Sequence, residues 1–163
     1  MAAGDYTIKA EQGASFLLFL EYQDDVGVGI PLKYYKSAMQ VRRSVEDPDL
    51  LLTVTGSTVN LPGGTAWTGA LTGPSTPYTE FGLTGGISGS GNIRLDVSAA
   101  GATGSTGGIL VTIDGDTMAK LPSGKHFYDL EIFGDDSASQ SREGITVIKI
   151  IKGRFEVEPE VTR

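Results

Sequence analysis

DTMAKLPSGKHFYDLEIF, residues 116–133, gives the clearest indication of the fold. Asp116 can cap a single helical turn that runs through Lys120, and Leu121-Pro122 would end it. The strand predicted over His126–Phe133 alternates between two sets of side chains, which is typical of a strand with one buried face. The residues predicted to face the core are Tyr128, Leu130 and Ile132.

Further strands are predicted along the chain, and three of them have informative patterns. Ser15 to Gln23 is apolar on both faces, which predicts a strand covered on both sides or one near a subunit contact. Tyr35 to Arg43 alternates and predicts a strand with one solvated face. Ile145 to Val157 is rich in Ile and Val, and its inward set changes parity between Lys149 and Gly153. That change predicts a bulge or a bend at Gly153.

Seven or eight short strands with Gly-rich turns predict an all-β fold, an antiparallel immunoglobulin-like β-sandwich. The turn before Tyr128 is similar to the tyrosine corner of such sandwiches, and an ordinary core tyrosine fits the residues equally well. The length predicts a single domain over residues 1–163. The predicted core is Phe16, Leu18, Leu20, Met39, Val41, Leu95, Val111, Tyr128, Leu130, Ile132 and Val147.

Residues 56–92 differ from the rest of the chain, because they contain 10 Gly and 7 Thr, with Glu80 as the single charged residue. This segment also carries the aromatic residues Trp67, Tyr78 and Phe81. Disordered linkers usually lack aromatic residues, and catalytic loops bring His, Cys or carboxylates. We predict a long neutral loop whose three aromatic side chains dock on a neighbouring subunit. The alternatives are packing of the loop on its own sandwich and stacking on a sugar.

The charge and the cysteine content exclude several classes of function. The sequence has 13 Lys and Arg against 20 Asp and Glu, a formal net charge of −7, which argues against nucleic acid and anionic membranes as partners. The absence of Cys excludes disulfides, thiolate catalysis and sulfur-based zinc sites, and favours folding in a reducing cytoplasm. The start of the sequence lacks the pattern of a signal peptide. The longest apolar run, Phe16 to Leu20, is too short to cross a bilayer.

The inventory of reactive residues predicts no catalytic residue, no cofactor and no metal, so we expect that the protein is not an enzyme. His126 is the one histidine, and its place in a strand predicts a surface or strand-edge position. Asp114-Gly115-Asp116 is similar to the opening of a calcium loop, but Met118 occupies the third ligand position. We therefore interpret it as a turn with a helix N-cap.

Four short motifs near the two ends of the chain resemble those of a known group of proteins. They are IKAEQGASF at residues 8–16, AMQVR at 38–42, FYDLE at 127–131 and GRFEVEPEVTR at 153–163. Together they resemble small structural proteins of tailed bacteriophages, described as virion or tail-associated proteins. The match covers about half of the chain, and residues 56–92 are longer and more Gly-rich than the corresponding segment in that family.

The resemblance implies an immunoglobulin-like sandwich with a non-enzymatic role as a virion structural protein. The expected protein is a multi-copy component of the tail or baseplate that assembles in the host cytoplasm through strand edges and loops. Its partners would be other virion subunits or further copies of itself. One alternative is a capsid decoration or head-tail neck protein, and another is a carbohydrate-binding module in host adhesion.

Overall fold

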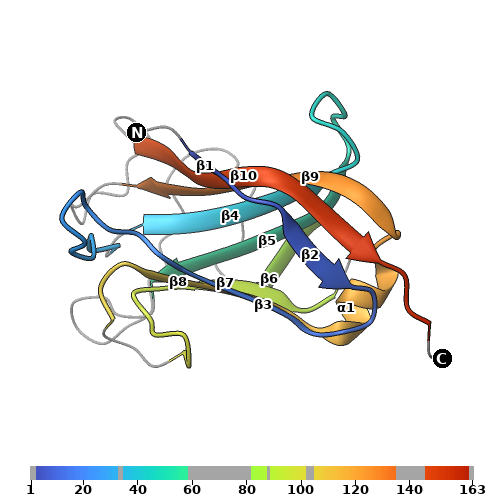
Figure 1. The fold of residues 1–163 in the computed structure, drawn as a ribbon, viewed down its shortest axis with the longest axis horizontal. Helices are drawn as coiled ribbons and strands as arrows, with labels where there is room; N and C mark the ends of the chain where they lie inside the picture. Colours follow the sequence, from blue (N-terminus) through green and yellow to red (C-terminus); the bar gives the residue numbers. More distant parts are fainter. Residues whose placement is uncertain are drawn as a thin grey trace.

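The computed structural model describes residues 3–32, 35–58, 82–87, 89–101, 105–134 and 146–161. Its elements are strands apart from one short helix (Figure 1). They are β1 (Gly4–Asp5), β2 (Ile8–Glu11), β3 (Phe16–Glu21), β4 (Tyr35–Arg42), β5 (Leu50–Thr58), β6 (Gly82–Gly86), β7 (Gly91–Leu95), β8 (Gly108–Ile113), α1 (Gly115–Lys120), β9 (Gly124–Gly134) and β10 (Thr146–Glu158). In the described part of the chain, no helix is long and apolar enough to span a membrane.

The strands form two layers (Figure 1). In the first layer β10, β9, β4 and β5 are neighbours and antiparallel, and β1 and β2 run parallel to β10 along its free edge. In the second layer β8 pairs antiparallel with β7 and with β3. The end of β5 pairs in parallel with β7, which connects the layers through hydrogen bonds. This arrangement confirms the all-β, immunoglobulin-like sandwich.

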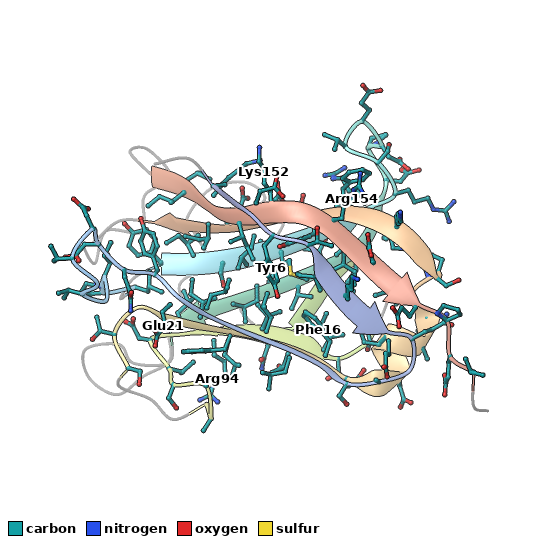
Figure 2. The ribbon with its side chains drawn as sticks, viewed as in Figure 1. Tyr6, Phe16, Glu21, Arg94, Lys152 and Arg154 are labelled. Atoms are coloured by element: carbon teal, nitrogen blue, oxygen red, sulfur yellow. The ribbon has the colours of Figure 1, made fainter. Side chains whose placement is uncertain are left out.

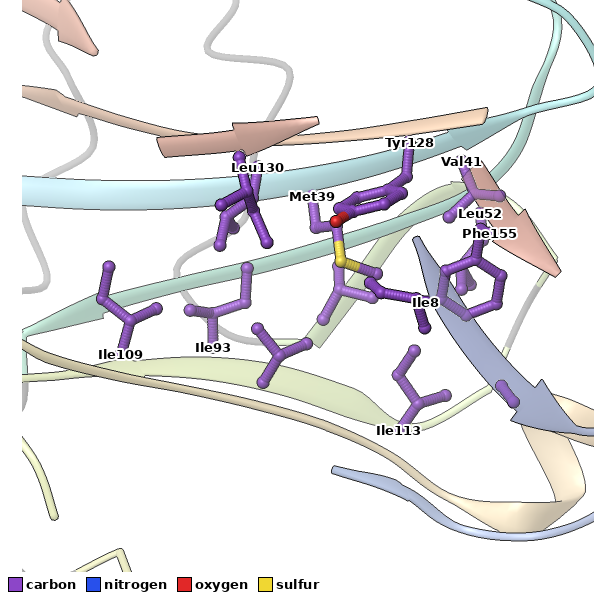
Figure 3. Close-up of a cluster of buried hydrophobic side chains, with 14 of the residues drawn as sticks. Ile8, Met39, Val41, Leu52, Ile93, Ile109, Ile113, Tyr128, Leu130 and Phe155 are labelled. Carbon is purple, nitrogen blue, oxygen red and sulfur yellow. The ribbon is translucent and has the colours of Figure 1, made fainter. Parts of the chain in front are cut away.

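The core lies between the layers and consists of inward aliphatic and aromatic side chains (Figure 3). Phe155 of β10 makes edge-to-face contacts with Phe16 of β3 and with Tyr128 of β9, at centroid distances of 5.5 and 6.2 Å. It therefore packs across both layers. The predicted core residues that are buried are Met39, Val41, Leu95, Val111, Tyr128, Leu130 and Ile132. Those that pack against the core while partly exposed are Phe16, Leu18 and Leu20.

The prediction that Val147 is buried is wrong, because its side chain is 57% exposed. The predicted parity change between Lys149 and Gly153 is confirmed: the pairing of β10 with β9 shifts between Lys149 and Ile151, ahead of Gly153. Before the shift, Ile148 packs against the core in place of Val147. Gly153 has φ +154°, and a side chain at this position would collide with the carbonyl oxygen of Tyr6 in the N-terminal segment.

Two further expectations about the strands are corrected by the structure. The second face of β4 is not solvated along its whole length, since Lys36 and Ala38 are 1% and 0% exposed. The Tyr128 hydroxyl donates to the carbonyl of Tyr6 at 2.8 Å, so it does not tie down the preceding connection. Tyr128 is thus a core tyrosine and does not form a tyrosine corner.

The helix and the Gly-rich segment also differ from their predictions. The N-cap of α1 is Asp114, whose carboxylate accepts from the Thr117 N–H at 2.8 Å, rather than Asp116. The segment 56–92 is not one continuous loop, because the end of β5, all of β6 and the start of β7 lie within it. Residues 59–81 lie outside the described part.

Candidate binding groove

A groove of about 570 Å³ lies on the outer face of the first layer, away from the core. Its floor is formed by outward side chains of β4, β9 and β10. The N-terminal segment around Asp5 and Thr7 forms one wall, and the β4–β5 loop with Ser44 and Val45 forms the other. We call it the outer-face groove.

The strand register aligns the floor residues in rows across the three strands. Phe127 of β9 pairs directly with Arg42 of β4 on one side and with Arg154 of β10 on the other. Directly opposed residues in antiparallel strands point to the same face, so the side chains of Arg42 and Arg154 leave the sheet on the same face as Phe127, one on each side of it. Two strand spacings place the Cα atoms of Arg42 and Arg154 roughly 10 Å apart. The next row contains Asp129, paired with Lys152.

The Arg42 guanidinium is held in place by the β4–β5 loop. Its Nη1 donates to the carbonyls of Asp47 and Pro48, both at 2.8 Å, and its Nη2 donates to Gln40 Oε1 at 3.1 Å. These bonds fix its position before a ligand arrives, which lowers the entropy cost of binding at this end of the groove.

Lys149 and Asp129 form an ion pair at 2.9 Å, and this hydrogen bond raises the pKa of the Lys149 amine. Both side chains are partly exposed, so the pair contributes little to stability. Within the described residues, Lys152 and Arg154 make no ion pair of this kind. Figure 2 shows Lys152 and Arg154 along β10 on the side opposite the core.

The lining contains four cations, from Arg42, Lys149, Lys152 and Arg154, against two carboxylates. The formal charge of the outer-face groove is thus +2, whereas the whole chain carries −7. A concave site of one sign attracts ligands of the opposite sign, and guanidinium groups bind carboxylates in a bidentate manner. The arrangement is therefore suited to an anionic ligand.

The site residues predicted from the sequence lie elsewhere or are not described. Trp67, Tyr78 and Phe81 are outside the described residues. The expected surface position of His126 is wrong, because its side chain is 5% exposed and its Nε2 lies 2.7 Å from the Pro122 carbonyl. The described residues contain no group of three or more metal-ligating side chains. The expectation that the chain uses no metal stays a prediction.

The outer-face groove is not predictable from the sequence alone. Phe127 alternates with the inward Tyr128 and so belongs to the outward set of its strand, but its cationic neighbours come from strands far away in the chain. One usable signal was present: Lys152 and Arg154 alternate in the last strand beyond the point at which its parity changes.

No protein-family model matches the chain, and no curated protein matches it. Three similar solved structures have 10–12% identity to the chain. One, from a study of the cell-adhesive interactions of voltage-gated sodium channel β subunits, has a TM-score of 0.37 and covers 97% of this chain and 96% of that one. The second, extracellular domains of the sodium channel β4 subunit described as parallel homodimers, has a TM-score of 0.32 with 99% and 97% covered. The third, Tim-2, has a TM-score of 0.34 with 100% and 99% covered.

The predicted function is corrected. None of the three similar structures is a phage protein and no other comparison supports the phage virion role, so that prediction is withdrawn. The same correction applies to its alternatives on the capsid, at the neck and in sugar-dependent host adhesion. A physical reason for the misleading motifs is that AMQVR and FYDLE coincide with β4 and β9, the central strands of the first layer. Their alternation follows from the sandwich itself.

Proposed function

We propose that the chain is a non-enzymatic recognition domain that binds an acidic segment of a partner protein in the outer-face groove. The observation that carries this proposal is the charge of the groove, which is opposite to that of the chain. A surface that served only to keep the protein soluble would carry a net negative charge, like the rest of the chain. Four cations against two carboxylates leave an excess of positive charge in one concave site, which attracts carboxylates locally.

The chemistry of the floor favours a protein segment with acidic side chains. Arg42 is already oriented, and Arg154 offers a second guanidinium on the other side of Phe127. Arg154 can bind one carboxylate with two parallel N–H donors, whereas Arg42, three of whose N–H groups already donate within the chain, contributes its charge and its remaining N–H groups. The ring between them is an apolar surface for the methylene groups of Asp or Glu side chains. Lys152 in the next row extends the positive charge along the strand direction.

The absence of catalysis is part of the proposal and has one supporting observation. His126, the single histidine of the sequence, faces the interior and contacts the Pro122 carbonyl. It therefore does not reach the outer-face groove as a general base.

Binding of a fluorescein-labelled hexaglutamate peptide, measured by anisotropy, tests the proposal. The double variant Lys152→Ala, Arg154→Ala should bind the peptide roughly tenfold or more weakly, because two charge-assisted contacts are lost. The matched control is Lys9→Ala, Lys125→Ala, which removes the same charge from two exposed residues outside the groove. We expect the control to bind within about twofold of the wild type.

Three outcomes would overturn the proposal. The first is that the wild-type protein does not bind the peptide. The second is an equal loss in the control variant, which would show that net charge and not the groove decides binding. The third is binding of a sulfated oligosaccharide without binding of hexaglutamate, which would exclude an acidic peptide as the ligand.

A further inference from the structure

Strand β3 is an unprotected edge of the second layer. Among the described strands it pairs with β8 alone. Its first five residues, Phe16 to Leu20, are all apolar. Natural edge strands usually carry a Lys, a Pro or a bulge that discourages pairing with another chain, and this run contains none of them.

Within the described part of the chain, the outer side of β3 carries backbone hydrogen-bonding groups without a partner. The Tyr22 N–H donates to the Gly107 carbonyl at 2.8 Å, and the pairing continues in steps of two through Leu20 with Ile109. In an antiparallel ladder, alternate residues direct both amide groups to the partner. The even-numbered residues therefore bond to β8, whereas Leu17 and Phe19 direct their N–H and C=O groups to the open side.

The side chains of β3 are also incompletely covered. Phe16, Leu18 and Leu20 point toward the core but stay partly exposed, whereas the facing residues of β8, Ile109 and Val111, are 0% exposed. The outward Leu17 is 59% exposed. Contiguous apolar surface with free backbone groups is typical of a protein contact.

We propose that β3 pairs antiparallel with β3 of a second copy, so that the second layers of two molecules form one continuous sheet. The occupant is a second copy because the strand is self-complementary about a two-fold axis. With Leu18 on the axis, Leu17 faces Phe19 of the second copy, and Phe16 faces Leu20. Glu21 then faces Ser15, so no carboxylate opposes another. For a chain with a charge of −7, the uncharged run Phe16 to Leu20 lets two copies meet without opposing like charges.

Sedimentation velocity over a concentration series tests the dimer. The wild-type protein should associate to a dimer, and Leu17→Lys should raise the dissociation constant roughly tenfold or more, because symmetry places two lysines in each interface. Val147→Lys is the matched control, since Val147 is an outward strand residue that is 57% exposed in the other layer. Circular dichroism checks that both variants fold. A monomeric wild type, or a dimer that Leu17→Lys leaves unchanged, would overturn the proposal.

Disulfide trapping tests the register, and the chain has no cysteine of its own to interfere. Leu17 and Phe19 of the second copy would form a hydrogen-bonded pair with Cα atoms about 5.5 Å apart, which suits a disulfide. An equimolar mixture of Leu17→Cys and Phe19→Cys should therefore give more cross-linked dimer than either variant alone. If Phe19→Cys alone gave more cross-linked dimer than the mixture, Phe19 would lie on the two-fold axis, and this register would be overturned. The groove variant Lys152→Ala, Arg154→Ala should still form dimers. The dimer proposal and the recognition proposal are therefore tested independently of each other.

Discussion

The two edges of the sandwich at β10 and β3 are completed in different ways. Along β10 the chain supplies its own neighbour, because β1 and β2 pair with it in parallel, and Ile8 and Ala10 of β2 are buried. Along β3 no described strand provides such cover. We call β10 the closed edge and β3 the open edge. The first layer, which ends at the closed edge, has a charged groove on its outer face. The second layer, which ends at the open edge, has backbone groups without a partner among the described residues. This difference is the reason why we propose a ligand for the first layer and a second copy of the chain for the second.

The largest effect is expected where the two edges are joined. Phe155 is fully buried and contacts both Phe16 on the open edge and Tyr128 in the closed layer. Phe155→Ala should lower the free energy of unfolding by about 3–5 kcal/mol, through lost burial and the cavity that remains. Urea unfolding measures this change. Val147→Ala, in the same strand but exposed, should change it by less than about 0.5 kcal/mol. Similar losses in both variants would mean that Phe155 does not join the layers.

The alternation of apolar residues made the central strands predictable, whereas the edges and the groove depend on register. Tyr128 and Leu130 face the core as the period-two pattern indicates. The row that joins Arg42, Phe127 and Arg154 depends on how three strands align, and no local pattern encodes that alignment. Register between strands that are distant in the sequence follows from the packing of the whole core.

The failures of prediction have local physical causes. Val147 was assigned to the wrong face because the shift between Lys149 and Ile151 reverses the pattern, and a bulge of one residue is enough for that reversal. His126 belongs to the inward set of its strand, where its Nε2 contacts the Pro122 carbonyl. From the sequence alone, a polar residue in a strand is predicted to be exposed, because the hydrogen-bond partner that would satisfy it in the interior is not known.

A moderate effect is expected from weakening the closed edge. The Tyr128 hydroxyl donates to the Tyr6 carbonyl, and burial raises the pKa of Tyr128, so the hydroxyl stays protonated as a donor. Tyr128→Phe should lower the free energy of unfolding by about 0.5–1.5 kcal/mol, the net worth of one hydrogen bond. Hydrogen exchange of the β2 amides should also become faster, because the N-terminal segment loses an anchor.

Tyr22→Phe is the matched control for this change. Tyr22 follows the open edge, and its hydroxyl has no partner among the described residues. Its removal should leave both the stability and the exchange of β2 almost unchanged. If exchange in β2 is the same in both variants, the hydroxyl of Tyr128 does not secure the closed edge.

The smallest effect is expected at α1, which connects β8 of the open layer to β9 of the closed one. The hydrogen bond with Thr117 holds the pKa of the Asp114 carboxyl below its usual value of 3.8. A carboxyl whose pKa is lowered in the folded state stabilises the fold above the unfolded pKa, and this stabilisation is lost as the pH falls through the folded pKa. Asp114→Ala should therefore lower the melting temperature slightly at about pH 7, and the difference from the wild type should shrink below about pH 4.

Asp114→Asn keeps a capping side chain without the charge, so its melting temperature should stay closer to that of the wild type. Thermal unfolding followed by circular dichroism across this pH range measures the difference, and a deficit of Asp114→Ala that is constant with pH would show that the ionised carboxylate is not what caps the helix.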